Sequence, residues 1–174
     1  MPTHSAQEAA ELAQQRYRSG DLTGACEAFE RAGEAYLQAG DTLGAAEMKN
    51  NQAVALLRAR QAERALQAVS GTQAVFAAAG DARREGMAWA NQASALQALH
   101  RPKDAIEAYR KAADALERAG EGDLRAEVMQ LLAVLFLRRF KLFDSVLSLQ
   151  SGLLGVKNPT ARQRLMKKLL FIRF

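Results

Sequence analysis

Small and large apolar residues alternate with polar ones in segments that return along the chain at a spacing of 40 residues. Asn-Gln-Ala at residues 91–93 stands 40 positions after the same three residues at 51–53. The segments are rich in Ala, Leu, Gln, Glu and Arg, which favour helix, and poor in β-branched residues. The pattern predicts an all-α protein with helices over residues 6–18, 22–38, 43–59, 62–78, 82–99, 103–118, 122–138, 142–154 and 159–172.

Turn signals separate these predicted helices. Residues 19–21, 39–41 and 79–81 each place Gly where a left-handed cap can end one helix, followed by Asp, whose side chain can cap the next. Pro102 suits the first position of a helix, where its missing N–H costs nothing. Asn-Pro at residues 158–159 predicts an N-cap and first turn for the last helix.

A fixed period of this length is typical of a solenoid, in which each helix pair buries its apolar face against neighbouring pairs. We expect residues 1–174 to form a single solenoid with repeats at about 6–40, 41–80, 81–120 and 121–156 and a C-terminal helix at about 159–172. Small residues would bring the helices close, and larger ones would fill the space between hairpins. Three columns carry this packing: Ala13, Ala53, Ala93 and Ala133; Ala25, Ala65, Ala105 and Ser145; and Phe29, Val69, Tyr109 and Leu149.

The spacing of Trp89, Ala93, Ala105, Tyr109 and Ala112 is similar to the motif of the tetratricopeptide repeat (TPR) family. Less complete copies occupy three other repeats, at 9–32, 49–72 and 129–152. The 40-residue period, without the family's usual closing Pro, resembles the long-helix subgroup found in cargo adaptors and bacterial multi-repeat regulators. The resemblance implies a right-handed α-solenoid of antiparallel helix pairs, about four TPR-like repeats, and a C-terminal capping helix.

In this family the first helix of each pair lines a concave groove that holds an extended or helical peptide. Asn amides suit a peptide backbone, although an inter-repeat hydrogen bond is the alternative role for them. Arg side chains can pair with ligand carboxylates, or they can complement the dipole at a helix end. The resemblance implies a groove lined by Asn51, Asn91, Arg58, Arg138, Asn50, Gln130, Leu57 and Tyr17.

The C-terminal part is more apolar than one hairpin can bury on a single neighbour. The last helix offers three explanations: it caps the open end of the solenoid, it joins two copies in a homodimer, or it lies as a basic amphipathic helix on an acidic membrane surface. Capping is favoured, and membrane attachment is the least favoured. The residues expected to make an oligomer or membrane contact are Leu169, Leu170, Phe171 and Phe174.

Charge and cysteine content narrow the function classes. The net charge is +5, but six of the 24 basic residues follow residue 156 without an acidic residue, which leaves residues 1–156 at −1. A near-neutral body argues against binding nucleic acid, which needs basic charge along the contact surface. Cys26 is the only cysteine, so no internal disulfide can form, and its apolar neighbours predict a buried, inert thiol.

No residue pattern predicts chemistry. His4 and His100 form no metal-spaced cluster and no nucleophile–base pair, and the glycines are spaced as helix caps rather than as a phosphate-binding loop. We expect no catalytic residue, metal or cofactor. Without a secretory signal or an apolar run near the ~20 residues of a membrane helix, a cytoplasmic protein is expected. The sequence predicts a non-catalytic adaptor that binds a peptide or protein segment, with an oligomeric or membrane-surface assembly factor as the alternative.

Overall fold

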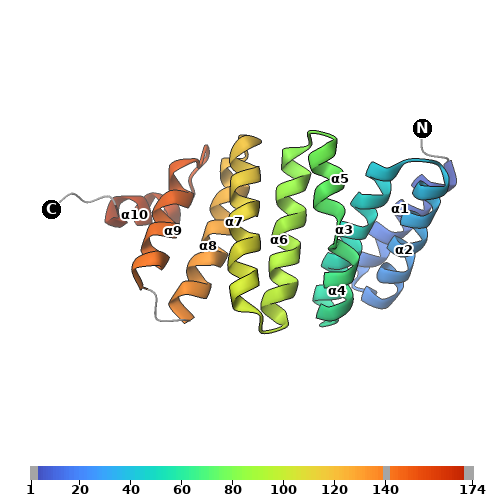
Figure 1. The fold of residues 1–174 in the computed structure, drawn as a ribbon, viewed down its shortest axis with the longest axis horizontal. Helices are drawn as coiled ribbons and strands as arrows, with labels where there is room; N and C mark the ends of the chain where they lie inside the picture. Colours follow the sequence, from blue (N-terminus) through green and yellow to red (C-terminus); the bar gives the residue numbers. More distant parts are fainter. Residues whose placement is uncertain (1–3, 139–141, 171–174) are drawn as a thin grey trace.

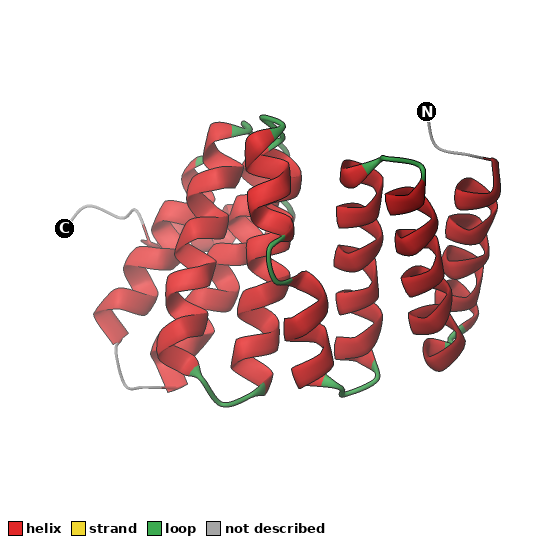
Figure 2. Ribbon diagram, turned by 45° about the vertical axis from the view of Figure 1, so that its right-hand side comes forward, coloured by secondary structure: helices red, strands yellow, loops and turns green. Residues whose placement is uncertain are grey.

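The computed structural model describes residues 4–138 and 142–170; within these ranges, the side chains of Arg138, Leu142, Phe143 and Leu169 are not described. The described residues form helices joined by short loops, without a strand (Figures 1 and 2). They make up ten helices: α1 (His4–Ser19), α2 (Leu22–Gln38), α3 (Thr42–Arg58), α4 (Ala62–Val69), α5 (Thr72–Ala78), α6 (Ala82–Ala98), α7 (Pro102–Arg118), α8 (Gly122–Arg138), α9 (Leu142–Leu154) and α10 (Ala161–Leu170).

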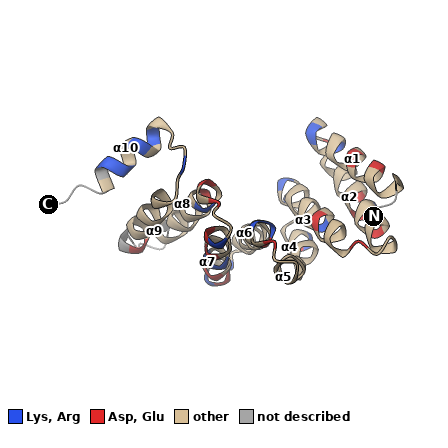
Figure 3. Cartoon of the chain, turned by 90° about the horizontal axis from the view of Figure 1, so that it is seen from above, with Lys and Arg blue, Asp and Glu red and all other residues tan. Residues whose placement is uncertain are grey.

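The helices stack as antiparallel pairs into a curved solenoid. Figure 1 shows the pairs following one another along the long axis, and Figure 3 shows the same arrangement from above as an arc. The first helices of the pairs, α1, α3, α6 and α8, lie on the concave side of the arc, and α2, α4, α5, α7 and α9 lie on the convex side. The predicted all-α solenoid of antiparallel helix pairs is confirmed.

The turns repeat every 20 residues. Residues 20, 40, 60, 80, 100 and 120 all have positive φ, between 58° and 85°, although Arg60 and His100 replace Gly in this series. The following Asp residues cap helices as predicted: the carboxylates of Asp21, Asp41 and Asp81 accept hydrogen bonds of 2.8–2.9 Å from backbone N–H groups three residues later. Uniform turns therefore set the repeat length of the solenoid.

The prediction of one continuous helix over 62–78 is wrong, because α4 ends at Val69 and α5 begins at Thr72. Ser70 is extended, with ψ 127°, and Gly71 is left-handed, with φ 85°, a conformation that is strained for residues with a Cβ atom. The Thr72 hydroxyl donates a 2.8 Å hydrogen bond to the Val69 carbonyl across the break. The amides of Gln73 and Gln92 then bond α5 to α6.

The last helix begins later than expected. α10 covers Ala161–Leu170, whereas residues 171 and 172 of the predicted helix lie outside the described residues. Thr160 and Gln163 form a reciprocal capping box in place of the predicted Asn158 cap: each side chain accepts a hydrogen bond from the other residue's backbone N–H. The Gln150 amide on α9 donates a 2.6 Å hydrogen bond to the Leu170 carbonyl, which fixes α10 to α9.

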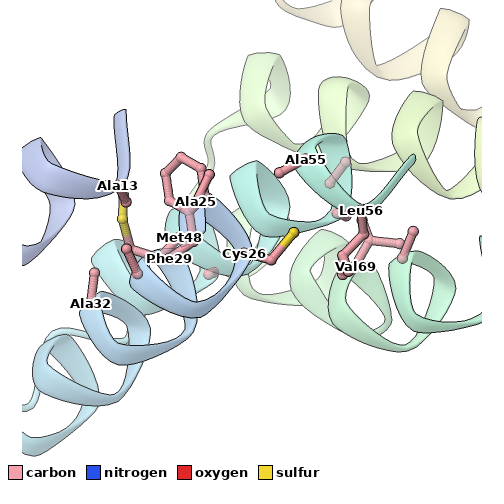
Figure 4. Packing of buried hydrophobic residues seen from close by; sticks show 14 of the residues in the cluster. Ala13, Ala25, Cys26, Phe29, Ala32, Met48, Ala55, Leu56 and Val69 are labelled. Carbon is pink, nitrogen blue, oxygen red and sulfur yellow. The ribbon is translucent and has the colours of Figure 1, made fainter. Parts of the chain in front are cut away.

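The core includes the predicted columns of small residues alongside larger buried side chains such as Leu56, Phe76 and Leu116. All eight members of the first two columns are buried, and Phe29, Val69 and Tyr109 of the third are buried as well. Figure 4 shows Ala13, Ala25 and Phe29 in the core cluster of the N-terminal repeats. Cys26 lies buried in the same cluster, and burial raises the pKa of its thiol, so the prediction of a buried thiol is confirmed.

Candidate functional site

The concave side of the arc opens into two cavities. One, of about 510 Å³, lies between α1 and α3, and its lining includes Glu11, Arg18 and Glu47. The other, of about 420 Å³, lies between α6 and α8 and is lined by Ser94, Gln97, Ala98, His100, Tyr109 and Leu131. Both cavities involve the first helices of the pairs, which are the helices that the sequence assigned to the groove.

Tyr17 and Arg58, two predicted groove residues 41 positions apart, lie in contact. The guanidinium carbon of Arg58 is 4.8 Å from the centroid of the Tyr17 ring, at the distance of a cation–π interaction. Tyr17 and Leu57 are half-buried and pack against the N-terminal core cluster. Arg58 is exposed, so its charge stays accessible while the ring of the preceding repeat restrains its side chain.

The predicted asparagines divide into two roles. Nδ2 of Asn91 on α6 donates a 2.9 Å hydrogen bond to Oδ1 of Asn50 on α3. Asn50 is buried, so its expected place as a groove-lining contact needs correction: its acceptor is used between repeats. Asn51 is half-buried, and its side chain makes no hydrogen bond within the described residues, which leaves its amide available to a ligand.

The α8 side of the groove is mainly apolar. Gln130 is half-buried, and the side chain of Arg138 lies outside the described residues. Leu131, Val134 and Leu137 are exposed large apolar residues. The resemblance to the repeat family also places them in columns that line the groove, although none was among the residues expected to contact a ligand. The sequence already shows these three apolar residues at intervals of three along one predicted helix. In the other repeats, polar residues occupy the positions equivalent to Leu131.

Tyr109 gives the α6–α8 cavity a polar group at its base. Its hydroxyl lies 3.1 Å from the Ser94 hydroxyl and donates a 3.2 Å hydrogen bond to Oε1 of Gln97. Burial raises the pKa of the Tyr109 phenol, and the Ser94 hydrogen bond offsets part of that effect. The residue was predicted as packing alone, yet it also contributes hydrogen-bonding atoms to a cavity.

Charged side chains of both signs surround the α1–α3 cavity, because Glu11, Glu47 and Arg18 line it. Tyr36 from α2 lines it, and burial raises the pKa of the Tyr36 phenol, with further increases from the carboxylates of Asp41, Glu47 and Glu11. An Arg84 side chain lies 3.7 Å from the Glu47 carboxylate and partly balances this charge. The two cavities therefore differ: carboxylate and guanidinium groups line the N-terminal one, whereas the C-terminal one combines apolar side chains with hydroxyl, amide and imidazole groups.

Most of the residues predicted for oligomer or membrane contact lie outside the part of the chain that the structure describes. Phe171 and Phe174 lie outside the described residues, as does the side chain of Leu169, while the Leu170 carbonyl bonds to α9. Other apolar residues at this end are exposed: Val146 by 42%, Leu147 by 53%, Leu154 by 66% and Leu165 by 58%. α10 therefore leaves part of the C-terminal apolar surface open to solvent.

Within residues 4–138 and 142–170, no group of three or more His, Cys, Asp or Glu side chains is arranged to hold a metal ion. No helix in that part of the chain has the length and apolar character required to cross a membrane.

Comparison with protein-family models gives no match, and comparison with curated proteins gives none either. Solved structures share the fold. BtubC (BKLC) from P. vanneervenii has a TM-score of 0.78 and 16% sequence identity, over 92% of this chain and 69% of its own. A kinesin light chain from Podosopora anserina, with nearly identical TPR-like repeats, has a TM-score of 0.74 and 15% identity, over 97% of this chain and 87% of its own. MamA protein has a TM-score of 0.52 at 15% identity, over 86% of this chain and 91% of its own.

These likenesses, together with the helix pairs, define the class of the molecule as a helical-repeat solenoid. More narrowly, its fold is that of the TPR-like proteins, as the Trp89 motif predicted. At 15–16% identity, the likeness concerns the fold.

Proposed function

We propose that the chain is a non-catalytic protein-interaction scaffold that holds a segment of a partner protein on its concave face. The observation that carries this proposal is that one cavity lies at α1 and α3 and another at α6 and α8, and that these four helices are on the concave side of the arc. Protein interfaces combine an apolar centre with a limited number of polar contacts, and both kinds of group are present here. A cytoplasmic location remains the expectation from the sequence.

Individual residues support the proposal in different ways. Asn51 offers a free amide to the backbone of an extended segment. Arg58, restrained over Tyr17, offers a cation whose position is already limited before binding, which reduces the entropy cost of a contact with a carboxylate. Tyr109, Ser94 and Gln97 offer hydrogen-bonding atoms beside Leu131.

Two matched substitutions, each replacing an exposed alanine with arginine, test which face of the solenoid binds the partner. Ala98 is exposed on α6 and lines the α6–α8 cavity, whereas Ala77 is exposed on α5, on the convex side. The full chain would be used to capture partners by cross-linking and mass spectrometry, and the recovered partner would then be purified and titrated. We expect Ala98→Arg to weaken binding by about tenfold or more and Ala77→Arg to leave it within about twofold. The reverse result would place the binding surface on the convex face.

Self-association through the C-terminal end is a second candidate, favoured by the exposure of Leu147 and Leu165. Light scattering of the full chain should then show a dimer that Leu147→Glu with Leu165→Glu converts to a monomer. A monomeric parent protein over the micromolar range would reject this candidate. Flotation with anionic and neutral vesicles addresses the membrane alternative, which requires binding to the anionic vesicles alone.

A further inference from the structure

α8 presents a stripe of apolar side chains near the C-terminal end of the concave face. Leu131, Val134 and Leu137 are 44%, 42% and 47% exposed. Residues three apart on a helix are neighbours on its surface, so the three side chains form one continuous strip rather than scattered contacts. Leu131 also lines the α6–α8 cavity, which joins the strip to the hydroxyl of Tyr109. Contiguous exposed apolar surface of this kind marks an interaction site.

A strongly basic helix stands on the same side of the molecule. Figure 3 shows α10 on the concave side of the arc, beyond α8, with Lys and Arg along much of its length. Its sequence contains no acidic residue, and none of its cations forms an ion pair within the described residues. The exposed cations are Arg162, Arg164, Lys167 and Lys168. Their positive charge is therefore not compensated within this part of the chain.

We infer that this end of the concave face binds an acidic amphipathic segment of a partner protein. The apolar side of that segment would cover Leu131, Val134 and Leu137, and its carboxylates would face the cations of α10. This inference rests on the proposed scaffold function and names the chemical class of the partner. Charge complementarity selects the ligand and accelerates its association, whereas burial of the three apolar side chains supplies most of the affinity.

Two other occupants fit these features less well. A second copy of the chain brings another basic α10, which gives the cations of the first copy no opposite charge. A flat anionic membrane matches the cations, but α8 lies on the concave side of the arc, where a flat surface has poorer access. A narrow segment with both apolar and acidic side chains satisfies the two features together.

The probe is a fluorescein-labelled amphipathic helix of about 18 residues, built from Leu and Glu at helical spacing. A second peptide keeps the Leu positions and replaces each Glu with Lys. Fluorescence anisotropy with the full chain should show binding of the Glu peptide that weakens as salt is raised. The Lys peptide should bind at least about tenfold more weakly. Equal binding of the two peptides, or absence of binding to the Glu peptide, would overturn the inference.

Neutral substitutions separate the apolar contribution from the charge contribution. Leu131→Gln should weaken binding of the Glu peptide by about tenfold, whereas Leu37→Gln, at a leucine of α2 that is 48% exposed, should leave it unchanged. Lys167→Gln with Lys168→Gln should weaken binding and reduce its salt dependence. Arg31→Gln with Lys103→Gln removes two exposed cations from α2 and α7 and should change neither quantity. Circular dichroism checks that each variant is folded.

The outcomes distinguish this inference from the proposed function. If the captured partner depends on Ala98 but the Glu peptide does not bind, the inference fails and the scaffold proposal stands. If Ala98→Arg does not weaken binding of the partner and Leu131→Gln does not weaken binding of the Glu peptide, both the scaffold proposal and the inference fail. Binding to phosphatidylserine vesicles through Lys167 and Lys168, without binding of the Glu peptide, would identify α10 as a lipid-binding element and would also overturn the inference.

Discussion

The side chain of Asn91 on α6 reaches Asn50 on α3 and donates a 2.9 Å hydrogen bond from Nδ2 to Oδ1. The bond joins neighbouring repeats, and Asn50 is only 7% exposed, so water has little access to its acceptor. In a solenoid, contacts between adjacent repeats determine both stability and curvature. The pair therefore helps to hold the shape of the concave face on which the proposed ligand lies.

Adjacent asparagines provide a direct test of this role. Asn50→Ala removes the buried acceptor and leaves the Asn91 donor without its partner, so we expect the free energy of unfolding to fall by about 1–3 kcal/mol. Asn51→Ala removes no hydrogen bond within the described residues and should change it by less than about 0.5 kcal/mol. Urea unfolding followed by circular dichroism measures both values. Similar losses for the two variants would contradict the assigned roles.

The repeat architecture could be predicted because its signals are local. Helix-forming composition, Asp caps and columns of Ala recur at a constant spacing, and each repeat supports the assignment of the others. The break after Val69 was missed because Ser70 and Gly71 interrupt an otherwise helical segment that was assigned by analogy with the other pairs. A single Gly lowers helix stability modestly, so it does not by itself determine whether the chain continues or turns.

The site could be predicted less completely, because contacts across repeats depend on how the helices are rotated relative to each other. The sequence placed Asn50 and Asn91 on the groove-lining helices, but it could not decide whether they face a ligand or each other. Leu131 shares a groove-lining column with Glu11, Asn51 and Asn91, but ligand contacts in this mixed groove were assigned mainly to polar side chains.

At the turn positions with left-handed backbone, substitution to Gly and substitution from Gly should change the stability of the protein in opposite directions. Arg60 and His100 have φ of 59° and 58°, a conformation that costs residues with a Cβ atom about 1 kcal/mol more than Gly. Arg60→Gly and His100→Gly should therefore each stabilise the protein by up to about 1 kcal/mol. Gly80→Ala should destabilise it by a similar amount, because φ is 73° and the space around the new Cβ is open, so backbone strain is the main effect. Thermal melts that shift all three variants in one direction would contradict this account.

Close approach between α6 and α7 depends on the small residue at position 105. Ala105 is fully buried, so Ala105→Leu must displace neighbouring side chains and should lower the free energy of unfolding by about 1–3 kcal/mol. Ala98→Leu adds the same atoms at an exposed position of α6 and serves as the control, with a change below about 0.5 kcal/mol. An Ala105→Leu protein that melts at the parent temperature would show that the interface can accommodate the larger side chain.

Tyr109 should make stability depend on alkaline pH. Its pKa in the folded chain lies above the ordinary value of 10.0, chiefly because the phenol is buried. At pH values between the unfolded and folded pKa, the folded state therefore keeps a phenol proton that the unfolded state has lost. The resulting stability is complete below about pH 10 and declines as pH rises towards the folded pKa, by at most about 1.4 kcal/mol per pH unit. Tyr109→Phe should cost about 1 kcal/mol near neutral pH, through loss of the contacts with Ser94 and Gln97, but it should remove this part of the alkaline decline. Urea unfolding at about pH 8 and about pH 11 should therefore show the parent and variant stabilities converging, whereas a constant difference would contradict the role assigned to the buried phenol.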